Sequence, residues 1–192
     1  SISVLVGNLC FGKVGLKAPI LSSKFDLQKI QPLIRDFLKV GVISGIVLGI
    51  ILILISVVSE KVISSELVNS PLNSSLNIIT RLMYGGITEE IFMRFGLMTF
   101  LVWIIAKISN SESNWVFLSA ILISSLMFAL GHLPIVYATV EVVSFGLVTY
   151  ILIGNSIAGL VYGYLYWKKG LECSMISHMT THITFVVANF LF

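Results

Sequence analysis

Charged residues are scarce in this chain of 192 residues. Asp, Glu, Lys and Arg together make up 11% of it, whereas 57% of the residues are hydrophobic. A soluble domain carries about 25% charged residues and a smaller apolar share. Because so much apolar surface is unfavourable in water, the bilayer is the expected solvent. The composition therefore predicts an integral, multi-pass membrane protein.

Alternation of polar and apolar residues is also missing from the long apolar stretches. A membrane β-barrel needs strands of about ten residues with alternating polarity, and residues 40–58 and 116–130 do not alternate. Backbone groups in lipid must then bond within a helix. The sequence predicts an all-α bundle of about six to seven transmembrane helices, with a buried polar active site in a single domain that covers residues 1–192.

Cysteine is nearly absent, since Cys10 and Cys173 are the only two, and both stand in apolar or span-edge surroundings. This excludes a disulfide framework and the cysteine spacing that is typical of a metal site. Neither cysteine, nor any serine, has the surroundings of a nucleophile. A covalent acyl-enzyme is therefore not expected.

Positive charge is concentrated near the start of the chain. Six basic residues there outnumber Asp26 and Asp36: Lys13, Lys17, Lys24, Lys29, Arg35 and Lys39. The positive-inside rule predicts that this segment is cytoplasmic, and residues 13–36 are expected to form a basic interfacial segment that contacts anionic lipid. Nucleic-acid binding is not expected, because the basic residues flank membrane spans.

Apolar runs define the expected spans, which are residues 37–58, 76–108, 115–133, 135–153, 155–167 and 171–192. Gly154 is the expected joint between the fourth and the fifth, and Gly85 with Gly86 is an expected kink. Residues 2–11 are shorter than the roughly 20 that span a bilayer. We expect them to be the end of an earlier span, with a cleaved signal peptide as the alternative. Counting alternations places Lys168 and Lys169 opposite the basic segment, against the positive-inside rule.

Three charged residues interrupt the segment 76–108. A charge at the centre of a membrane helix costs on the order of 3 kcal/mol, and Glu89, Glu90 and Arg94 all stand there. Glu90 and Arg94 have i, i+4 spacing and are expected to pair. Glu89 points about 100° away on an ideal helix and needs a partner of its own.

All three histidines of the chain also fall in apolar spans. His132 ends the run 128–132 just before Pro134, and His178 and His182 share a face of the last span through i, i+4 spacing. Carboxylates and imidazoles together hold and deprotonate a water molecule. Alternatively, Glu89, His132 and His178 are candidate Zn²⁺ ligands, because a bound zinc ion lowers the pKa of its water.

Other interpretations of the polar residues stay open. Glu90 with Arg94 is explained by a structural ion pair alone, and a single membrane histidine by an interhelical hydrogen bond. Glu141 is expected within an apolar span as a structural or cavity-lining group, and Glu172 as a cap at the start of the last helix. A non-enzymatic immunity or scaffold protein and a small ion transporter are the competing functions, although no internal repeat supports a transporter.

Three motifs resemble those of a known family. Glu89-Glu90-Ile-Phe-Met-Arg94 matches EExxxR, Phe128-Ala-Leu-Gly-His132 matches FxxxH, and His178 opens an element of the type HxxxN or HxxxD. Their order is similar to that of the CAAX prenyl protease and bacteriocin-processing (Abi) family of intramembrane proteases. The run 163–172 resembles prokaryotic members, and the resemblance covers the motif-bearing core, residues 76–182.

The resemblance implies an intramembrane endopeptidase of the prokaryotic plasma membrane. It implies that Glu89 and His132 position and deprotonate the attacking water, and that Glu90 and Arg94 orient the site. His178 and the residue at position 182 would stabilise the oxyanion or help to hold a metal, since members are described both as metalloproteases and as metal-independent glutamate proteases. The chain departs from the family pattern at His182. The expected substrate is a peptide or protein, membrane-associated or lipidated.

Overall fold

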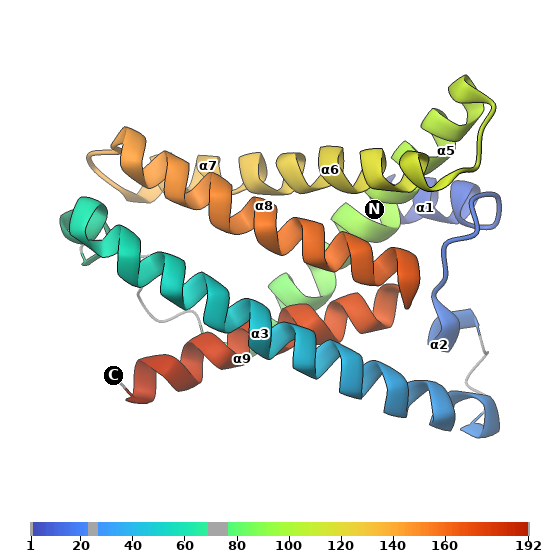
Figure 1. Cartoon of the computed structure of the whole chain (residues 1–192), viewed down its shortest axis with the longest axis horizontal. Coiled ribbons are helices and arrows are strands. Elements are labelled where there is room, and N and C mark those ends of the chain that lie inside the picture. Colours follow the sequence, from blue (N-terminus) through green and yellow to red (C-terminus); the bar gives the residue numbers. More distant parts are fainter. Residues whose placement is uncertain (1, 23–26, 69–76, 192) are drawn as a thin grey trace.

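A computed structural model describes residues 2–22, 27–68 and 77–191, and every regular element in these ranges is a helix (Figure 1). The elements are α1 (Ile2–Phe11), α2 (Pro19–Ser22), α3 (Leu27–Val68), α4 (Ile78–Thr80), η1 (Arg81–Glu89), η2 (Ile91–Met98), α5 (Thr99–Ser109), α6 (Asn114–Gly131), α7 (Leu133–Thr139), α8 (Phe145–Lys168) and α9 (Leu171–Leu191). The prediction of an all-α bundle is confirmed. The elements η1 and η2 are π-helical, and Gly85 and Gly86 lie within η1.

Within the described residues, four stretches are long and apolar enough to cross a membrane, namely Ile30–Glu60, Ile78–Ser109, Asn114–Thr139 and Phe145–Lys168. The division of residues 135–167 into two spans at Gly154 was wrong. Gly154 lies inside the single helix α8, because one glycine costs a helix only about 1 kcal/mol and its apolar neighbours continue the pattern. Glu141 is exposed in the connection between α7 and α8, and not within a span as predicted.

The junction of α8 with α9 lies at the same end of the bundle as the basic segment. Lys169 Nζ is 2.9 Å from Asp36 Oδ2, at the start of α3, and the Leu171 backbone N–H donates to the Lys17 carbonyl at 3.0 Å. The expected placement of Lys168 and Lys169 on the opposite side is therefore wrong. Since α8 is one helix and not two, the chain makes one crossing fewer than we counted.

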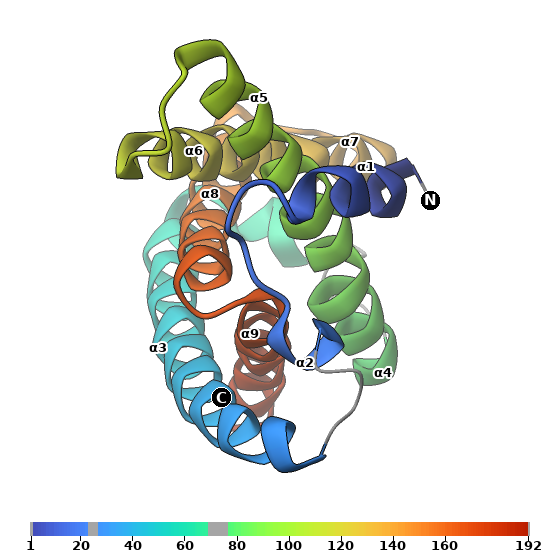
Figure 2. The same cartoon turned by 90° about the vertical axis from the view of Figure 1, so that its right-hand side faces the viewer.

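Helix α9 packs closely between other helices (Figure 2). Its closest neighbour is α3, where Gly41, Gly45 and Gly49 form a stripe at i, i+4 spacing. An added Cβ at Gly45 would lie 2.5 Å from the Ser177 carbonyl oxygen, and one at Gly49 would lie 2.7 Å from Cβ of Thr184. Small residues let membrane helices approach in this way. The stripe thus fixes the position of the helix that carries His178 and His182.

Candidate active site

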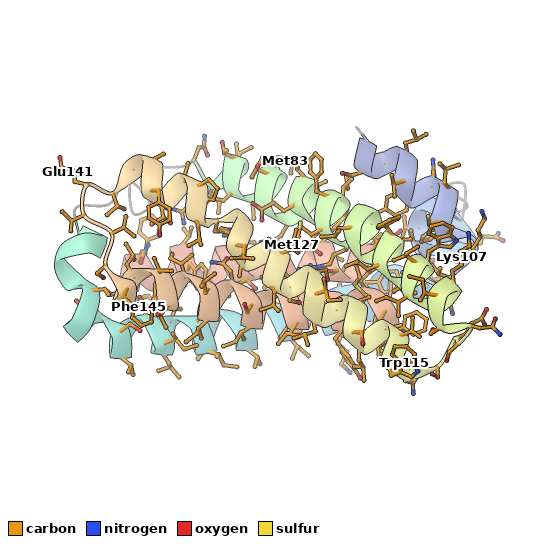
Figure 3. All side chains as sticks on the ribbon, turned by 90° about the horizontal axis from the view of Figure 1, so that it is seen from above. Met83, Lys107, Trp115, Met127, Glu141 and Phe145 are labelled. Atoms are coloured by element: carbon orange, nitrogen blue, oxygen red, sulfur yellow. The ribbon has the colours of Figure 1, made fainter. Side chains whose placement is uncertain are left out.

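The predicted site residues come from three parts of the bundle that surround one cavity. The π-helical elements carry the two glutamates and the arginine, the end of α6 carries His132, and α9 carries the other two histidines. The cavity has a volume of about 900 Å³, and its wall includes Glu89, His132, His178 and His182. Figure 3 shows Met83 on η1 and Met127 on α6, the two elements that flank it. The structure therefore brings four of the six predicted residues to one space.

Glu90 lies behind the cavity wall and is fully buried. Its Oε1 is 3.0 Å from His178 Nδ1, and its Oε2 accepts a hydrogen bond of 2.5 Å from the Ser174 hydroxyl, which also contacts the Tyr162 carbonyl. A carboxylate only accepts, so Nδ1 of His178 is the donor. This fixes the orientation of the ring and leaves Nε2 directed away from Glu90.

Glu89 shares that same imidazole. Its Oε2 lies 3.9 Å from His178 Nε2, and its side chain is 20% exposed, whereas that of Glu90 is completely buried. We expected Glu89, which points about 100° away from Glu90 on an ideal helix, to have its own partner among the histidines. His178 is that partner, and the same ring also contacts Glu90, because it fits between the two glutamates and presents one nitrogen to each of them.

Arg94 supplies the positive charge beneath the site. Its Nε is 3.4 Å from Glu90 Oε2, and both side chains are inaccessible, as the i, i+4 spacing predicts. Among the described residues, no group accepts a hydrogen bond from its three nitrogens. The guanidinium instead lies 5.2 Å from the ring centre of Phe128 and 5.9 Å from that of Tyr162. Cation–π contacts of this kind stabilise a desolvated cation by roughly 2 kcal/mol.

Aromatic rings hold His178 in place. The ring of Tyr162 stacks on it at 4.4 Å with an interplanar angle of 18°, and Phe128 meets it edge-on at 6.1 Å. Tyr162 and Phe128 are both buried. The imidazole is therefore confined on its faces by aromatic contacts and at Nδ1 by Glu90.

His132 is oriented by its own helix. Its Nδ1 is 2.8 Å from the Phe128 carbonyl oxygen, one turn earlier in α6. Because a carbonyl accepts only, Nδ1 carries the proton and Nε2 of the neutral ring is free to accept one. His132 thus offers a basic nitrogen in a cavity that Glu89 also lines.

His182 occupies the position where the motif departs from the family pattern. Its ring stacks on His178 at 5.0 Å with an interplanar angle of 21°, and its buried Nδ1 has no hydrogen-bond partner within the described part of the chain. On the opposite side, η1 comes close. A Cβ added at Gly85 would lie 2.5 Å from His182 Nε2 and 3.4 Å from His178 Nε2. Glycine at position 85 therefore makes room for both imidazoles.

The three candidate zinc ligands are Glu89, His132 and His178. Across residues 2–22, 27–68 and 77–191, no three His, Cys, Asp or Glu side chains form a group that could hold a metal ion. His178 also uses Nδ1 for Glu90, so only Nε2 is available for a ligand. The residues as arranged do not fit a zinc site, and zinc stays a prediction.

Three residues of the site were not identified from the sequence. Ser174 bonds to Glu90, Tyr162 stacks on His178, and Gly85 admits the imidazoles. Ser174 had a usable signal, because it stands one turn before His178 and so shares its face of α9. Tyr162 had none, since the sequence does not reveal which face of α8 meets α9.

The comparisons with known proteins agree with the motifs. The sequence model of the family described as "Type II CAAX prenyl endopeptidase Rce1-like" matches residues 71–184, more than half of the chain and all six predicted site residues. No curated protein and no solved structure matches the chain.

Proposed function

The chain belongs to the Rce1-like family of type II CAAX prenyl endopeptidases, and we propose that it hydrolyses a peptide bond within the membrane with a water molecule activated by Glu89 and His132. The observation that carries this proposal is the sharing of one imidazole by two glutamates of different exposure. One glutamate holds the ring from behind, and the other shares the cavity with it.

Glu89 is the proposed general base. Its Oε2 and Nε2 of His178 are 3.9 Å apart, too far for a direct hydrogen bond but a separation that one oxygen atom contacting both would bridge. In the proposed step, the water oxygen attacks the carbonyl carbon of the substrate while its proton passes to Glu89. His132 Nε2 accepts a hydrogen bond from the same water and orients it.

His178 and His182 are the proposed oxyanion stabilisers. In its protonated form, His178 donates Nε2–H to the oxygen that becomes negative when water adds, while Nδ1–H remains bonded to Glu90. His182 lies one helical turn further along α9 and lines the same cavity. When the C–N bond breaks, the proton held by Glu89 passes to the leaving amine, and the enzyme returns to its initial state.

Glu90, Arg94 and Ser174 are positioning residues in this proposal. Glu90 orients His178 through Nδ1, Ser174 donates to Glu90, and Arg94 neutralises it. Burial makes this support rigid, because an unpaired charge at that depth is strongly unfavourable. The substrate class that the family suggests is a peptide or protein segment, membrane-associated or lipidated.

Alanine substitution of the two water-activating residues tests the proposal. Glu89→Ala and His132→Ala should each abolish peptide hydrolysis in proteoliposomes and leave the thermal unfolding midpoint close to that of the parent chain. Full activity in either variant would overturn the proposed chemistry. If no peptide substrate is hydrolysed by the parent chain either, the non-proteolytic alternative, an immunity or scaffold protein of the same family, gains support.

A further inference from the structure

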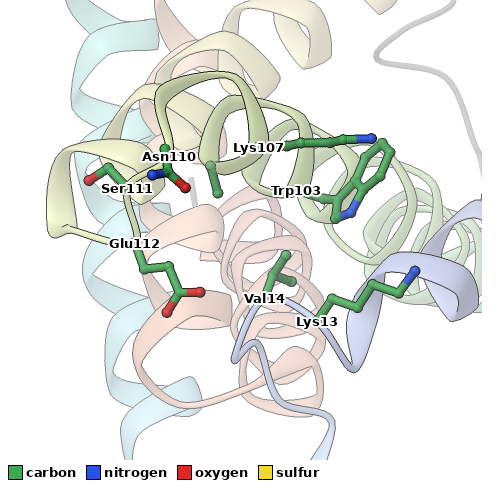
Figure 4. A pocket seen from close by; sticks show the side chains of 8 residues that line it. Lys13, Val14, Trp103, Lys107, Asn110, Ser111 and Glu112 are labelled. Carbon is green, nitrogen blue, oxygen red and sulfur yellow. The ribbon is translucent and has the colours of Figure 1, made fainter.

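A second hollow lies where two links of the chain meet at one end of the bundle (Figure 4). The link between α1 and α2 forms one wall, and the end of α5 with the link to α6 forms the other. The lining residues are Lys13, Val14, Trp103, Ala106, Lys107, Asn110, Ser111 and Glu112. Its volume of about 410 Å³ falls in the range of roughly 300–1,000 Å³ that is usual for small-ligand sites. The active-site cavity shares none of these residues, so the hollow is a separate space.

The floor of the hollow belongs to the packed core. Val14 and Ala106 pack against a cluster of buried residues that come from the α1–α2 link, η2, α5, α6, α8 and α9: Leu16, Ala18, Met98, Val102, Val116, Ala120, Ile121, Tyr166 and Leu171. On the other wall, Asn110 ends α5 in the left-handed conformation, and the Ser111 backbone N–H donates to the Ala106 carbonyl at 3.3 Å. Because packed interiors deform little, the two walls are held in a fixed relation and the hollow is preformed.

Two ammonium groups line the hollow without a carboxylate partner. Lys13 and Lys107 are both exposed, and within the described part of the chain neither forms an ion pair, although Glu112 lines the same hollow. Figure 4 shows the Glu112 carboxylate on the opposite side of the hollow from both lysine side chains. Lys107 Nζ instead lies 5.1 Å from the centre of the Trp103 ring. The lining thus carries a net positive charge that is not neutralised within the protein.

The hollow lies at the level of the lipid headgroups. Lys107 stands two residues before the end of the span Ile78–Ser109, and the next span begins at Asn114, so the link between them lies just outside the hydrocarbon region. Trp103 and Trp115 stand on either side of this link, and tryptophan is enriched where the bilayer meets water. Figure 3 shows Lys107 and Trp115 at the same end of the bundle. Basic pockets between helices at this level bind the headgroups of anionic lipids.

We propose that the hollow is a binding site for the headgroup of an anionic phospholipid of the phosphoglycerol type, whose phosphodiester contacts Lys13 and Lys107. Two lysines and one glutamate give the lining a formal charge of +1, which a phosphodiester with its single negative charge neutralises. Asn110, Ser111 and Glu112 offer hydrogen-bonding groups to the hydroxyls of the headgroup. The bound lipid connects the α1–α2 link with the α5–α6 link. This inference is independent of the proposed peptidase function.

Lipid binding to the purified full chain in detergent micelles tests the site. An uncharged micelle has no anionic surface of its own, so binding of added phosphatidylglycerol, measured by native mass spectrometry, reports direct contact. Lys13→Gln combined with Lys107→Gln should weaken the affinity by roughly 30-fold, because each lysine beside an anionic lipid contributes about 1 kcal/mol and about 1.4 kcal/mol is tenfold.

Lys17→Gln combined with Lys39→Gln is the matched control. It removes the same charge from two exposed lysines at the same end of the bundle, and neither of them lines the hollow. This variant should bind phosphatidylglycerol as tightly as the parent chain. Bound lipid should also raise the thermal unfolding midpoint of the parent and control chains and leave that of the Lys13, Lys107 variant unchanged. Equal loss of binding in the two double variants would show general attraction by charge and overturn the proposed site.

Two further titrations of the parent chain identify the ligand. Phosphatidylcholine, whose headgroup has no net charge, should bind about tenfold more weakly or less, since it leaves the net charge of the lining in place. Glycerophosphoglycerol, the same headgroup without acyl chains, should not displace phosphatidylglycerol at equal concentration. Displacement would show that the hollow takes a free phosphate compound and overturn the assignment to lipid. Equal affinity for the two lipids would overturn the selection for an anionic headgroup.

Discussion

His178 Nδ1 donates to Glu90 Oε1 over 3.0 Å, in a place that water does not reach. The same ring presents Nε2 to Glu89, which faces the cavity. One imidazole thus connects a carboxylate that only the protein contacts with one that a substrate can contact. Neighbouring glutamates are therefore expected to respond differently to substitution, Glu90 mainly through stability and Glu89 mainly through rate.

The ion pair of Glu90 with Arg94 predicts a strong coupling in stability. Arg94→Met leaves a buried carboxylate without its cation, which should destabilise the chain by about 3–5 kcal/mol. Glu90→Gln combined with Arg94→Met removes both charges and should recover much of that loss. Unfolding in detergent micelles, measured for the two single variants and the double variant, gives the coupling energy. Additive effects would show that the two charges do not stabilise each other.

Ser174 should be needed for activity beyond its share in stability. Ser174→Ala removes the donor to Glu90 and leaves a buried acceptor unsatisfied, a loss of about 1–3 kcal/mol, and frees the ring of His178 to turn. Ser177→Ala is the matched control, since Ser177 is equally buried on α9 but bonds to Ser44 of α3 at 3.0 Å. We expect kcat to fall for Ser174→Ala alone. Equal kcat in both variants would contradict the positioning role.

Gly85 should not tolerate a side chain. The Cβ of Gly85→Ala would meet His182 Nε2 at 2.5 Å, so η1 or the imidazole must move. Peptide hydrolysis should then decrease sharply, because a small misplacement of catalytic groups is costly. Gly131→Ala is the control, as Gly131 lines the same cavity and an added Cβ there meets nothing within 4 Å. Comparable rates for the two variants would count against the close approach.

His182→Asn restores the residue type that the family motif leads one to expect. Asn donates a hydrogen bond through its amide, so this variant should keep measurable hydrolysis, whereas His182→Ala should lose roughly a hundredfold in kcat, the effect of removing one oxyanion donor. Steady-state kinetics on the same peptide measures both. If His182→Ala hydrolyses the peptide as fast as the parent chain, position 182 takes no part in the reaction.

Treatment with a chelator separates the two ways of activating water. If Glu89 and His132 suffice, hydrolysis should persist after dialysis against a strong chelator, with elemental analysis showing less than one metal ion per chain. The arrangement of the described side chains favours this result, since no three of them are placed to hold an ion. Loss of activity that returns when Zn²⁺ is added would instead establish a metal-dependent enzyme.

The sequence indicated six candidate site residues because lipid makes each of them costly. A charged residue or a histidine in an apolar span must be compensated, and this identifies six residues to explain: Glu89, Glu90, Arg94, His132, His178 and His182. The contacts between these residues were harder to predict from the sequence. Glu90 with Arg94 follows from spacing within one helix, whereas contact with His178 depends on how α9 packs against η1, which a single sequence does not reveal.

The errors in the fold came from local signals that tertiary packing overrides. Gly154 resembled the end of a helix, yet α8 continues through it because the apolar pattern is uninterrupted on both sides. That extra break produced the wrong side for Lys168 and Lys169. Serines in apolar helices were hard to interpret, because such a hydroxyl usually bonds to the backbone of its own helix and does not mark a functional site. The hydroxyl alone does not distinguish Ser174, which bonds to Glu90, from Ser125, which bonds to the Ile121 carbonyl. Only the position of Ser174 one turn before His178 separates the two.

The glycine stripe of α3 has a consequence for how the protein is made. Helix α9 is not among the four described stretches that are long and apolar enough to cross a membrane, and it carries two histidines and three threonines. Such a helix partitions poorly into lipid by itself. Helix α3 is synthesised earlier, so its Gly41, Gly45 and Gly49 surface is already in the membrane when α9 leaves the ribosome. Docking of α9 on this surface is then the step that completes the active site.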